Sequence, residues 1–136
     1  LSFLISMTCL TSQSWALLNC PSSPPFVNCY GSFTYPNGDT YIGEWQNNKM
    51  VGKGIYIFGP DSKFAGDQYN GGFKDGEYYG KGKYTTSSGN IYKGEFRNNN
   101  RNGQFEVNYK SGAKYIGQFK DDKKHALRIE LSDQKL

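Results

Sequence analysis

The chain has 136 residues, a formal net charge of +4, and 11 Tyr, 9 Phe and 17 Gly. This length allows one domain at most. Hydrophobic content that is mainly aromatic, with many glycines for turns, favours a single-layer β structure over a globule packed with aliphatic side chains. The charge is too small for a nucleic-acid-binding tail, so no nucleic-acid partner is expected.

The first segment, residues 1–16, has the features of a secretory signal peptide. Leu1 to Leu10 form an apolar run of the right length, and Ser14-Trp15-Ala16 offers small residues at a cleavage site. The run is too short to cross a bilayer core of ~30 Å. We therefore expect export to a periplasmic or secreted location. A buried N-terminal strand or helix is the alternative interpretation.

Residues 17–30 form a Pro-rich segment that contains Cys20 and Cys29. A pair of cysteines in an exported chain predicts a disulfide, which would stabilise such a short loop by ~2–3 kcal/mol. Two alternatives remain open. Cys20 could be a lipidated N-terminus, because Leu17-Leu18-Asn19-Cys20 loosely resembles a lipoprotein signal. The pair could also bind a metal, although no other soft ligands cluster nearby.

Residues 31–126 are built from a repeated Tyr-x-Gly-x-aromatic unit. A partial unit at residues 31–38 is followed by units that start at Tyr41, Tyr69, Tyr92 and Tyr115. The last three starts are 23 residues apart, whereas the first gap is 28 because residues are inserted within 59–68. The repeat-defining residues are Tyr41, Gly43, Trp45, Tyr69, Gly71, Phe73, Tyr92, Gly94, Phe96, Tyr115, Gly117 and Phe119.

Each unit has the alternation of a half-buried strand, with aromatic side chains and glycine on one face. A polar turn follows, then a Gly-x-Gly stretch such as Gly52 to Gly54, then a second alternating strand and a Ser-Gly or Asn-Gly turn. The fold class predicted is all-β, an elongated single-layer antiparallel meander of stacked β-hairpins. Glycine between two aromatics leaves a slot for neighbouring rings, so the aromatic stripe is interpreted as core, with a binding face as the alternative.

The unit resembles the MORN (membrane occupation and recognition nexus) repeat, over residues 29–126. The resemblance implies an elongated, twisted sheet of stacked hairpins and, from the family's name, a lipid-surface module. Together with the predicted signal peptide it indicates a MORN repeat protein of an exported, bacterial type. Three positions depart from the pattern: Gly72 replaces an acidic residue, Phe105 replaces a glycine and Ala126 replaces a glycine. Residues 127–136 are interpreted as a C-terminal cap, in which Leu127 to Leu131 could add a strand.

No arrangement of residues predicts catalysis, so the chain is not expected to be an enzyme. The one histidine, His125, is interpreted as structural, and Gly76 to Gly82 lacks the spacing of a phosphate-binding loop. The repeat itself explains the recurring carboxylates Glu44 and Glu95. We predict no catalytic, cofactor-binding or metal-binding residues and no small-molecule substrate.

The expected function is protein–protein interaction, self-association or scaffolding in an exported compartment. The first alternative is peripheral binding to anionic lipid surfaces through basic residues in the turns and on the outer face, namely Lys49, Lys53, Lys81, Lys83, Lys93 and Arg97, with Lys74 and Arg101 beside them. The second alternative is glycan or cell-wall binding through exposed aromatic rings.

Overall fold

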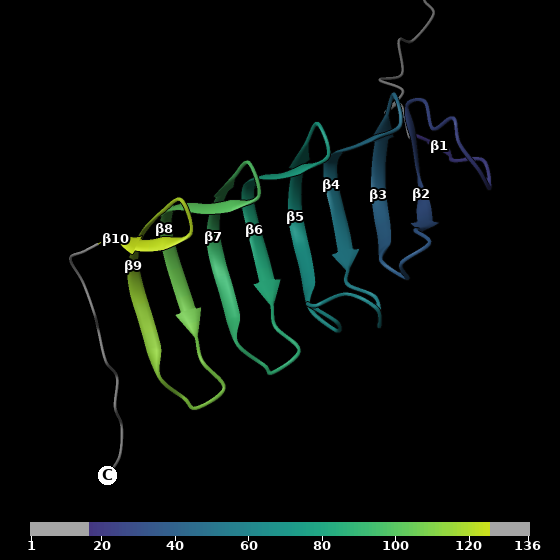
Figure 1. The fold of residues 1–136 in the computed structure, drawn as a ribbon. Helices are drawn as coiled ribbons and strands as arrows, with labels where there is room; N and C mark the ends of the chain where they lie inside the picture. The colour runs from purple at the N-terminus through teal and green to yellow at the C-terminus, as the bar shows by residue number, and fades with distance from the viewer. Residues whose placement is uncertain (1–16, 126–136) are drawn as a thin grey trace, which may run out of the picture.

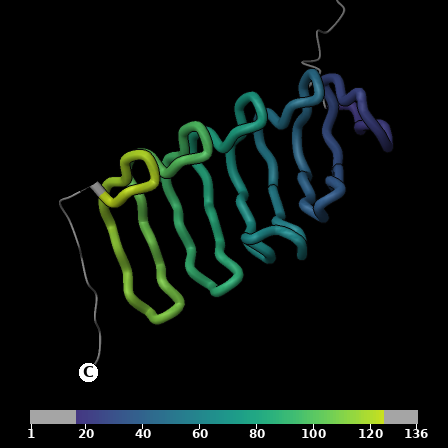
Figure 2. Tube along the Cα trace, viewed as in Figure 1, coloured from purple at the N-terminus to yellow at the C-terminus, as the bar shows by residue number. Residues whose placement is uncertain are grey.

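The computed structural model describes residues 17–125, which form one open 10-stranded sheet (Figures 1 and 2). The strands lie side by side in chain order, and every neighbouring pair is antiparallel except β1 and β2. Their bounds are β1 Leu18–Asn19, β2 Cys29–Thr34, β3 Thr40–Gln46, β4 Lys49–Ile57, β5 Gln68–Lys74, β6 Glu77–Thr85, β7 Ile91–Arg97, β8 Asn100–Asn108, β9 Lys114–Lys120 and β10 Lys123–His125. The predicted all-β meander of stacked hairpins is confirmed.

Two predicted segments cannot be compared with the structure. The signal peptide at residues 1–16 and the C-terminal cap at residues 127–136, with its strand at Leu127 to Leu131, lie outside the described residues. Within residues 17–125 no helix has the length and apolarity needed to cross a membrane.

Two-residue turns close the hairpins at one end of the sheet. Asn47 and Asn48, which join β3 to β4, both have positive φ, of 49° and 63°. The turns at 75–76, 98–99 and 121–122 share this conformation. Positive φ at both central residues defines the type I′ turn, whose twist matches that of paired strands and which favours Asn, Asp and Gly. The polar turns recognised in the sequence are therefore hairpin turns.

The Gly-x-Gly stretches lie inside the second strand of each hairpin, not before it as the sequence pattern predicted. β4 already begins at Lys49, and its pairing with β3 shifts register between Gly43 and Glu44. Gly52 absorbs this bulge because its φ of +59° belongs to the left-handed region. Each hairpin consequently bends near its two-residue turn, and Figure 2 shows the tips turning out of the plane of the long strand segments.

The core is an unbroken chain of aromatic rings that runs along the sheet. Within a unit the Tyr41 and Trp45 rings meet edge to face at 4.9 Å, and Tyr41 then meets Phe73 of the next unit, also at 4.9 Å. The same contact links Tyr69 to Phe96 at 5.0 Å. Edge-to-face pairs at such distances stabilise a core beyond the area that they bury. Each hairpin is therefore held by its neighbours.

The glycines of each unit provide the space in which its tyrosine ring lies. The Tyr41 ring covers Gly43 and Gly54, where an added Cβ would collide with the ring. The Tyr41 hydroxyl donates a hydrogen bond to the Glu44 carbonyl at 3.0 Å. Tyr69 covers the equivalent glycines, and Tyr69 and Tyr115 make the equivalent hydrogen bond to residue i+3. The predicted slot for a flat ring is present, and the ring that fills it belongs to the same unit.

The third unit fills its slot in a different way. A Cβ on Gly94 would meet the Phe105 ring, at 2.6 Å, so Phe105 occupies the place that Tyr41 and Tyr69 occupy elsewhere. Phe105 also continues the ring chain, at 5.2 Å from Phe96 and 5.1 Å from Phe119. The Tyr92 ring is displaced and only half-buried. Phe105, which stands where the repeat pattern has a glycine, thus takes the place over Gly94 that the Tyr92 ring would otherwise fill.

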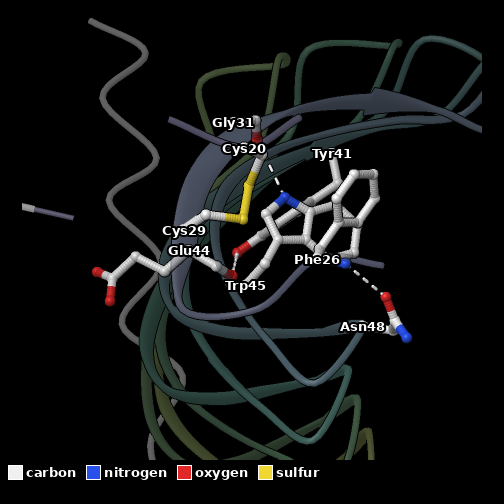
Figure 3. The surroundings of a disulfide bond; sticks show 8 residues. All are labelled: Cys20, Phe26, Cys29, Gly31, Tyr41, Glu44, Trp45 and Asn48. Atoms are coloured by element: carbon white, nitrogen blue, oxygen red, sulfur yellow. Dashed lines mark hydrogen bonds between the residues drawn. A yellow bond between two sulfur atoms is a disulfide. The ribbon is translucent and has the colours of Figure 1, made fainter. Parts of the chain in front are cut away.

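The N-terminal segment completes the ring chain before the first full unit. Cys20 and Cys29 form a disulfide, and Phe26 in the loop between them packs 4.7 Å from the Trp45 ring (Figure 3). The Phe26 amide donates a hydrogen bond to Asn48 Oδ1, and the Asn48 amide donates one to the Phe26 carbonyl at 2.8 Å. Tyr78 and Asn99 pair in the same way. Phe26 therefore stands in for a residue of a preceding repeat.

The fit between ring and glycine gives a test of the core. Gly54→Ala should lower the free energy of unfolding by about 1–3 kcal/mol, because the added methyl group overpacks against the Tyr41 ring. In a Tyr41→Leu background the same substitution should cost less, since the colliding ring is gone. Chemical denaturation of the two single variants and the double variant would measure this coupling. An equal cost in both backgrounds would contradict the contact.

Candidate functional site

The bend in the hairpins creates a groove on the concave face of the sheet. Its volume is about 570 Å³, within the range of ligand-binding clefts. We call it the concave groove, and it is lined by Met50, Tyr56, Phe58, Phe64, Asp67, Gly76, Tyr78, Tyr84, Thr86, Tyr92, Phe96, Asn99, Arg101 and Asp122. Most of these residues come from the hairpin tips, the far ends of the second strands and the loop between β4 and β5, and Tyr92 and Phe96 come from β7.

The lining is mainly aromatic and partly open to solvent. Tyr56, Tyr78 and Tyr84 are half-buried, whereas the rings beneath them are fully buried. The inserted loop between β4 and β5 adds Phe64, which is 44% exposed and packs at 5.4 Å from Phe58. Partly exposed Tyr and Phe with an adaptable Met are the residue types enriched in protein interfaces. The groove therefore offers apolar rings that the core does not use.

Two buried carboxylates hold tyrosines of the second strands in place. Asp39 and Asp67 are only 5% and 7% exposed. The Tyr56 hydroxyl donates to Asp39 at 2.7 Å, and the Tyr84 hydroxyl donates to Asp67 at 2.6 Å. Each carboxylate also accepts from the backbone of the next turn, at Gly59 and Ser87, both at 2.8 Å. These bonds orient the rings and tie each unit to its neighbour.

The surroundings of these carboxylates shift their ionisation and that of the tyrosines. Burial acts to raise the pKa of Asp39, but the hydrogen bonds from Gly59, Tyr56 and Asn37 outweigh it and leave this pKa below its usual value of 3.8. Burial and the bond to Asp39 raise the pKa of Tyr56. Burial and the bond to Asp67 raise the pKa of Tyr84. Both tyrosines are therefore neutral hydrogen-bond donors at ordinary pH.

The C-terminal end of the groove carries the ion pair of Arg101 with Asp122. The Arg101 guanidinium lies 4.8 Å from the centre of the Tyr92 ring and 4.6 Å from that of Phe119, and its Nε donates to Asp122 at 3.0 Å. Lys124 lies 4.7 Å from the Tyr115 ring. The sequence pattern placed Arg101 with the lysines of the turns and outer face, whereas the structure places it in the groove. The displaced Tyr92 ring provides the surface on which it rests.

The structure places the repeat-defining residues in the core. All the aromatic residues named by the repeat pattern are buried except Tyr92, and Gly43, Gly71 and Gly117 are buried beside them. The groove instead takes most of its rings from the second strands, the tips and the inserted loop. Buried rings in mutual contact leave little surface for a ligand, so the accessible aromatic residues differ from those that define the repeat.

The six basic residues predicted to contact an anionic surface are exposed. These are Lys49, Lys53, Lys81, Lys83, Lys93 and Arg97. Lys81 lies opposite Glu95 across β6 and β7, whereas Lys83 lies directly opposite Lys93. Lys83 and Lys93 are thus adjacent basic side chains on neighbouring strands. Like charges that face each other across two strands repel. The row of these two lysines across the sheet continues with the uncharged Asn70 beside Lys83 and with Glu106 beside Lys93.

Sequence reasoning missed the two carboxylates that orient the groove tyrosines. Asp39 and Asp67 each stand two residues before the first tyrosine of a unit, and Asn90 stands at the same distance from Tyr92. The partner tyrosine is replaced by Val107 where the aspartate is replaced by Asn90. This paired change between units was the available signal. In residues 17–125 no group of three or more His, Cys, Asp or Glu side chains could hold a metal ion.

The lowered pKa of Asp39 makes an acid-sensitive contribution to stability. A lowered pKa in the folded state stabilises the fold above the unfolded-state pKa and is lost as pH falls through the folded-state pKa, here below about pH 4. Asp39→Asn should cost about 1–3 kcal/mol at neutral pH and progressively less in acid. Urea titrations across this pH range would measure it. Asp61→Asn, at an exposed aspartate, is the control, and an equal pH dependence in both variants would refute the assignment.

Comparison with known proteins identifies the repeat. The family model described as MORN repeat matches residues 30–40, 41–63, 69–91, 92–104 and 115–126. No curated protein matches the chain. The matched residues include the partial first unit and cover more than half of the sequence, and their boundaries at residues 41, 69, 92 and 115 coincide with the first tyrosine of each full unit. The chain therefore belongs to the MORN repeat family.

Proposed function

We propose that the protein is a non-catalytic interaction module that binds a segment of a partner protein in the concave groove. The single observation that supports this most strongly is the row of half-buried Tyr56, Tyr78 and Tyr84 with Met50 and exposed Phe64 in a groove of about 570 Å³. MORN repeats act generally as modules for protein or membrane interaction. The groove favours the former, because its lining is aromatic and carries few charges.

The proposed compartment is an exported one, periplasmic or secreted. Two features support this proposal: the apolar run with small residues near its end at residues 1–16, and the Cys20–Cys29 disulfide. Disulfides persist in oxidising compartments and are rare in the cytosol. The oxidised pair also stabilises the Phe26 loop that completes the core.

Membrane binding is the second candidate, and one observation favours it. Lys83 and Lys93 lie directly opposite each other on the outer face and are both exposed. Two lysines could approach an anionic headgroup layer together. However, Glu95 and Glu106 lie beside them in the sheet, and this reduces the local positive charge. We therefore rank this function below protein binding.

Site-directed photocrosslinking would test the groove. A photoreactive phenylalanine in place of Phe64 should capture a partner in an extract of the native source, whereas the same group in place of Tyr79 should not. Tyr79 is a matched control because it is similarly exposed, at 39% against 44%, and lies outside the concave groove. The captured protein would be identified by mass spectrometry and purified. Equal capture at both positions would count against the groove.

The purified partner allows a quantitative test. Met50→Lys should weaken its binding at least tenfold, because a charge would be desolvated among the groove rings. Lys83→Glu, on the outer face, should leave the affinity within about threefold. Isothermal titration calorimetry would measure both. A large loss with Lys83→Glu and none with Met50→Lys would move the binding site to the outer face.

Sedimentation with anionic phospholipid vesicles would distinguish membrane binding from protein binding. We expect the protein to remain in the supernatant at low ionic strength. Pelleting that decreases with added salt and with a Lys83→Glu, Lys93→Glu double variant would instead support membrane binding.

A further inference from the structure

Exposed apolar side chains gather at the N-terminal end of the sheet. Large hydrophobic side chains that are exposed within residues 17–125 are Leu17, Leu18, Val27, Tyr30, Phe64 and Tyr79. Phe64 lines the groove and Tyr79 stands alone on another part of the sheet. The other four fall within residues 17–30, where Leu18 is 78% and Val27 is 57% exposed. Their concentration in one short segment favours an interaction site at this end of the sheet. The pairing of Leu18 with Cys29 and of Tyr30 with Glu44 puts these two side chains, Leu18 and Tyr30, on opposite faces of that end.

The segment itself carries no charged side chain, and the nearest one across the sheet is Glu44, opposite Tyr30. Residues 17–38 contain no Asp, Glu, Lys, Arg or His, and the first charged residue of the chain is Asp39. The opposite end is different, because β9, its turn and β10 carry Lys114, Lys120, Asp121, Asp122, Lys123 and Lys124. The chain as a whole has a formal charge of +4, so two copies repel each other. The repulsion between two copies is smallest when they meet through surfaces that lie far from the charged residues of both.

The apolar end is held in a defined shape. The disulfide joins Cys20 to Cys29, the Cys20 amide donates to the Tyr30 carbonyl at 3.0 Å, and Leu18 pairs with Cys29 across β1 and β2. Phe26 points inward onto Trp45 (Figure 3), whereas its neighbour Val27 is exposed. The exposed side chains are therefore not needed to complete the core. They are presented by a preorganised loop, which lowers the entropic cost of binding.

The edge strand supplies a second reason for association. Among the described residues β1 pairs with β2 alone, so its other side presents unpaired backbone groups at the end of the sheet (Figure 1). Such edges pair readily with another strand unless charge or proline blocks them. β1 contains neither a charged residue nor a proline. The unpaired backbone edge and the exposed Leu18 side chain therefore lie on the same strand.

We propose that residues 17–30 form a self-association surface through which two copies of this chain meet head to head. The occupant is a second copy because an uncharged apolar surface with an unpaired strand is complementary to itself. A head-to-head contact uses the same surface on both chains and closes at the dimer. A head-to-tail contact would place the apolar end against the lysines of the opposite end and would extend into a filament. The concave groove remains open in the dimer.

Sedimentation velocity of the full chain over a range of concentrations tests the proposal. We expect a reversible dimer without larger species. Leu18→Lys and Val27→Lys should each raise the dimer dissociation constant at least tenfold. Tyr79→Lys is the matched control, since it places the same charge on an exposed hydrophobic position elsewhere, and it should leave the constant within about twofold. A monomer at all concentrations, or equal effects of the three substitutions, would overturn the proposal.

Two further measurements separate loss of the dimer contact from loss of the fold and locate the contact on the second copy. Leu18→Lys should keep the circular dichroism spectrum and thermal midpoint of the native chain at concentrations where both are monomeric, because the side chain is exposed. A photoreactive residue in place of Leu18 should crosslink to residues 17–30 of the second copy, and crosslinks to any other part of it would overturn the head-to-head arrangement. Met50→Lys should leave the dimer intact, so failure of the groove proposal and failure of this one are distinguishable.

Discussion

The contact on which the rest of the structure depends is a tyrosine ring lying flat over glycines of its own hairpin and meeting the next unit edge to face. Tyr41 covers Gly43 and Gly54 and contacts Phe73, and Tyr69 repeats the arrangement. A single-layer sheet has no second layer to bury its apolar face, so the rings must bury one another. The glycines make this possible because any side chain in their place would lift the ring from the sheet.

The same constraint separates core from surface. Most aromatic side chains of the first strands are buried in the chain of core rings. Residues of the second strands and tips, such as Tyr56, Tyr78 and Tyr84, are half-buried. The bulge at Gly52 then bends the hairpin and turns these residues toward each other. The concave groove is thus a by-product of how the hairpins stack. Its chemistry varies along the sheet, from Met50 and Tyr78 to Arg101, because tip residues contribute little to the core and are free to differ between units.

The ends of a repeat array need separate solutions, because each terminal unit lacks one neighbour. At the N-terminal end a disulfide-closed loop positions Phe26 over Trp45, where a preceding repeat would contribute a side chain. At the other end, Arg101 and Lys124 lie over the rings of Tyr92, Phe119 and Tyr115. One end is covered by an aromatic residue on an uncharged segment and the other by cations. The two ends therefore differ in the partners that they can meet.

The sequence by itself determined the hairpins, their order and their turns, because these depend on a period of two, on Asn-Asn and Asp-Gly dipeptides and on a repeat that can be counted. It also predicted the space for a flat aromatic ring, since a glycine between two aromatic residues on one face of a strand leaves room for such a ring. The tertiary structure alone decided which rings remain accessible, that Phe105 replaces Tyr92 over Gly94, that Asp39 and Asp67 orient second-strand tyrosines, and that Arg101 enters the groove. All of these depend on contacts between residues of different strands or on the bend of the sheet. A pattern within one strand carries no information on either.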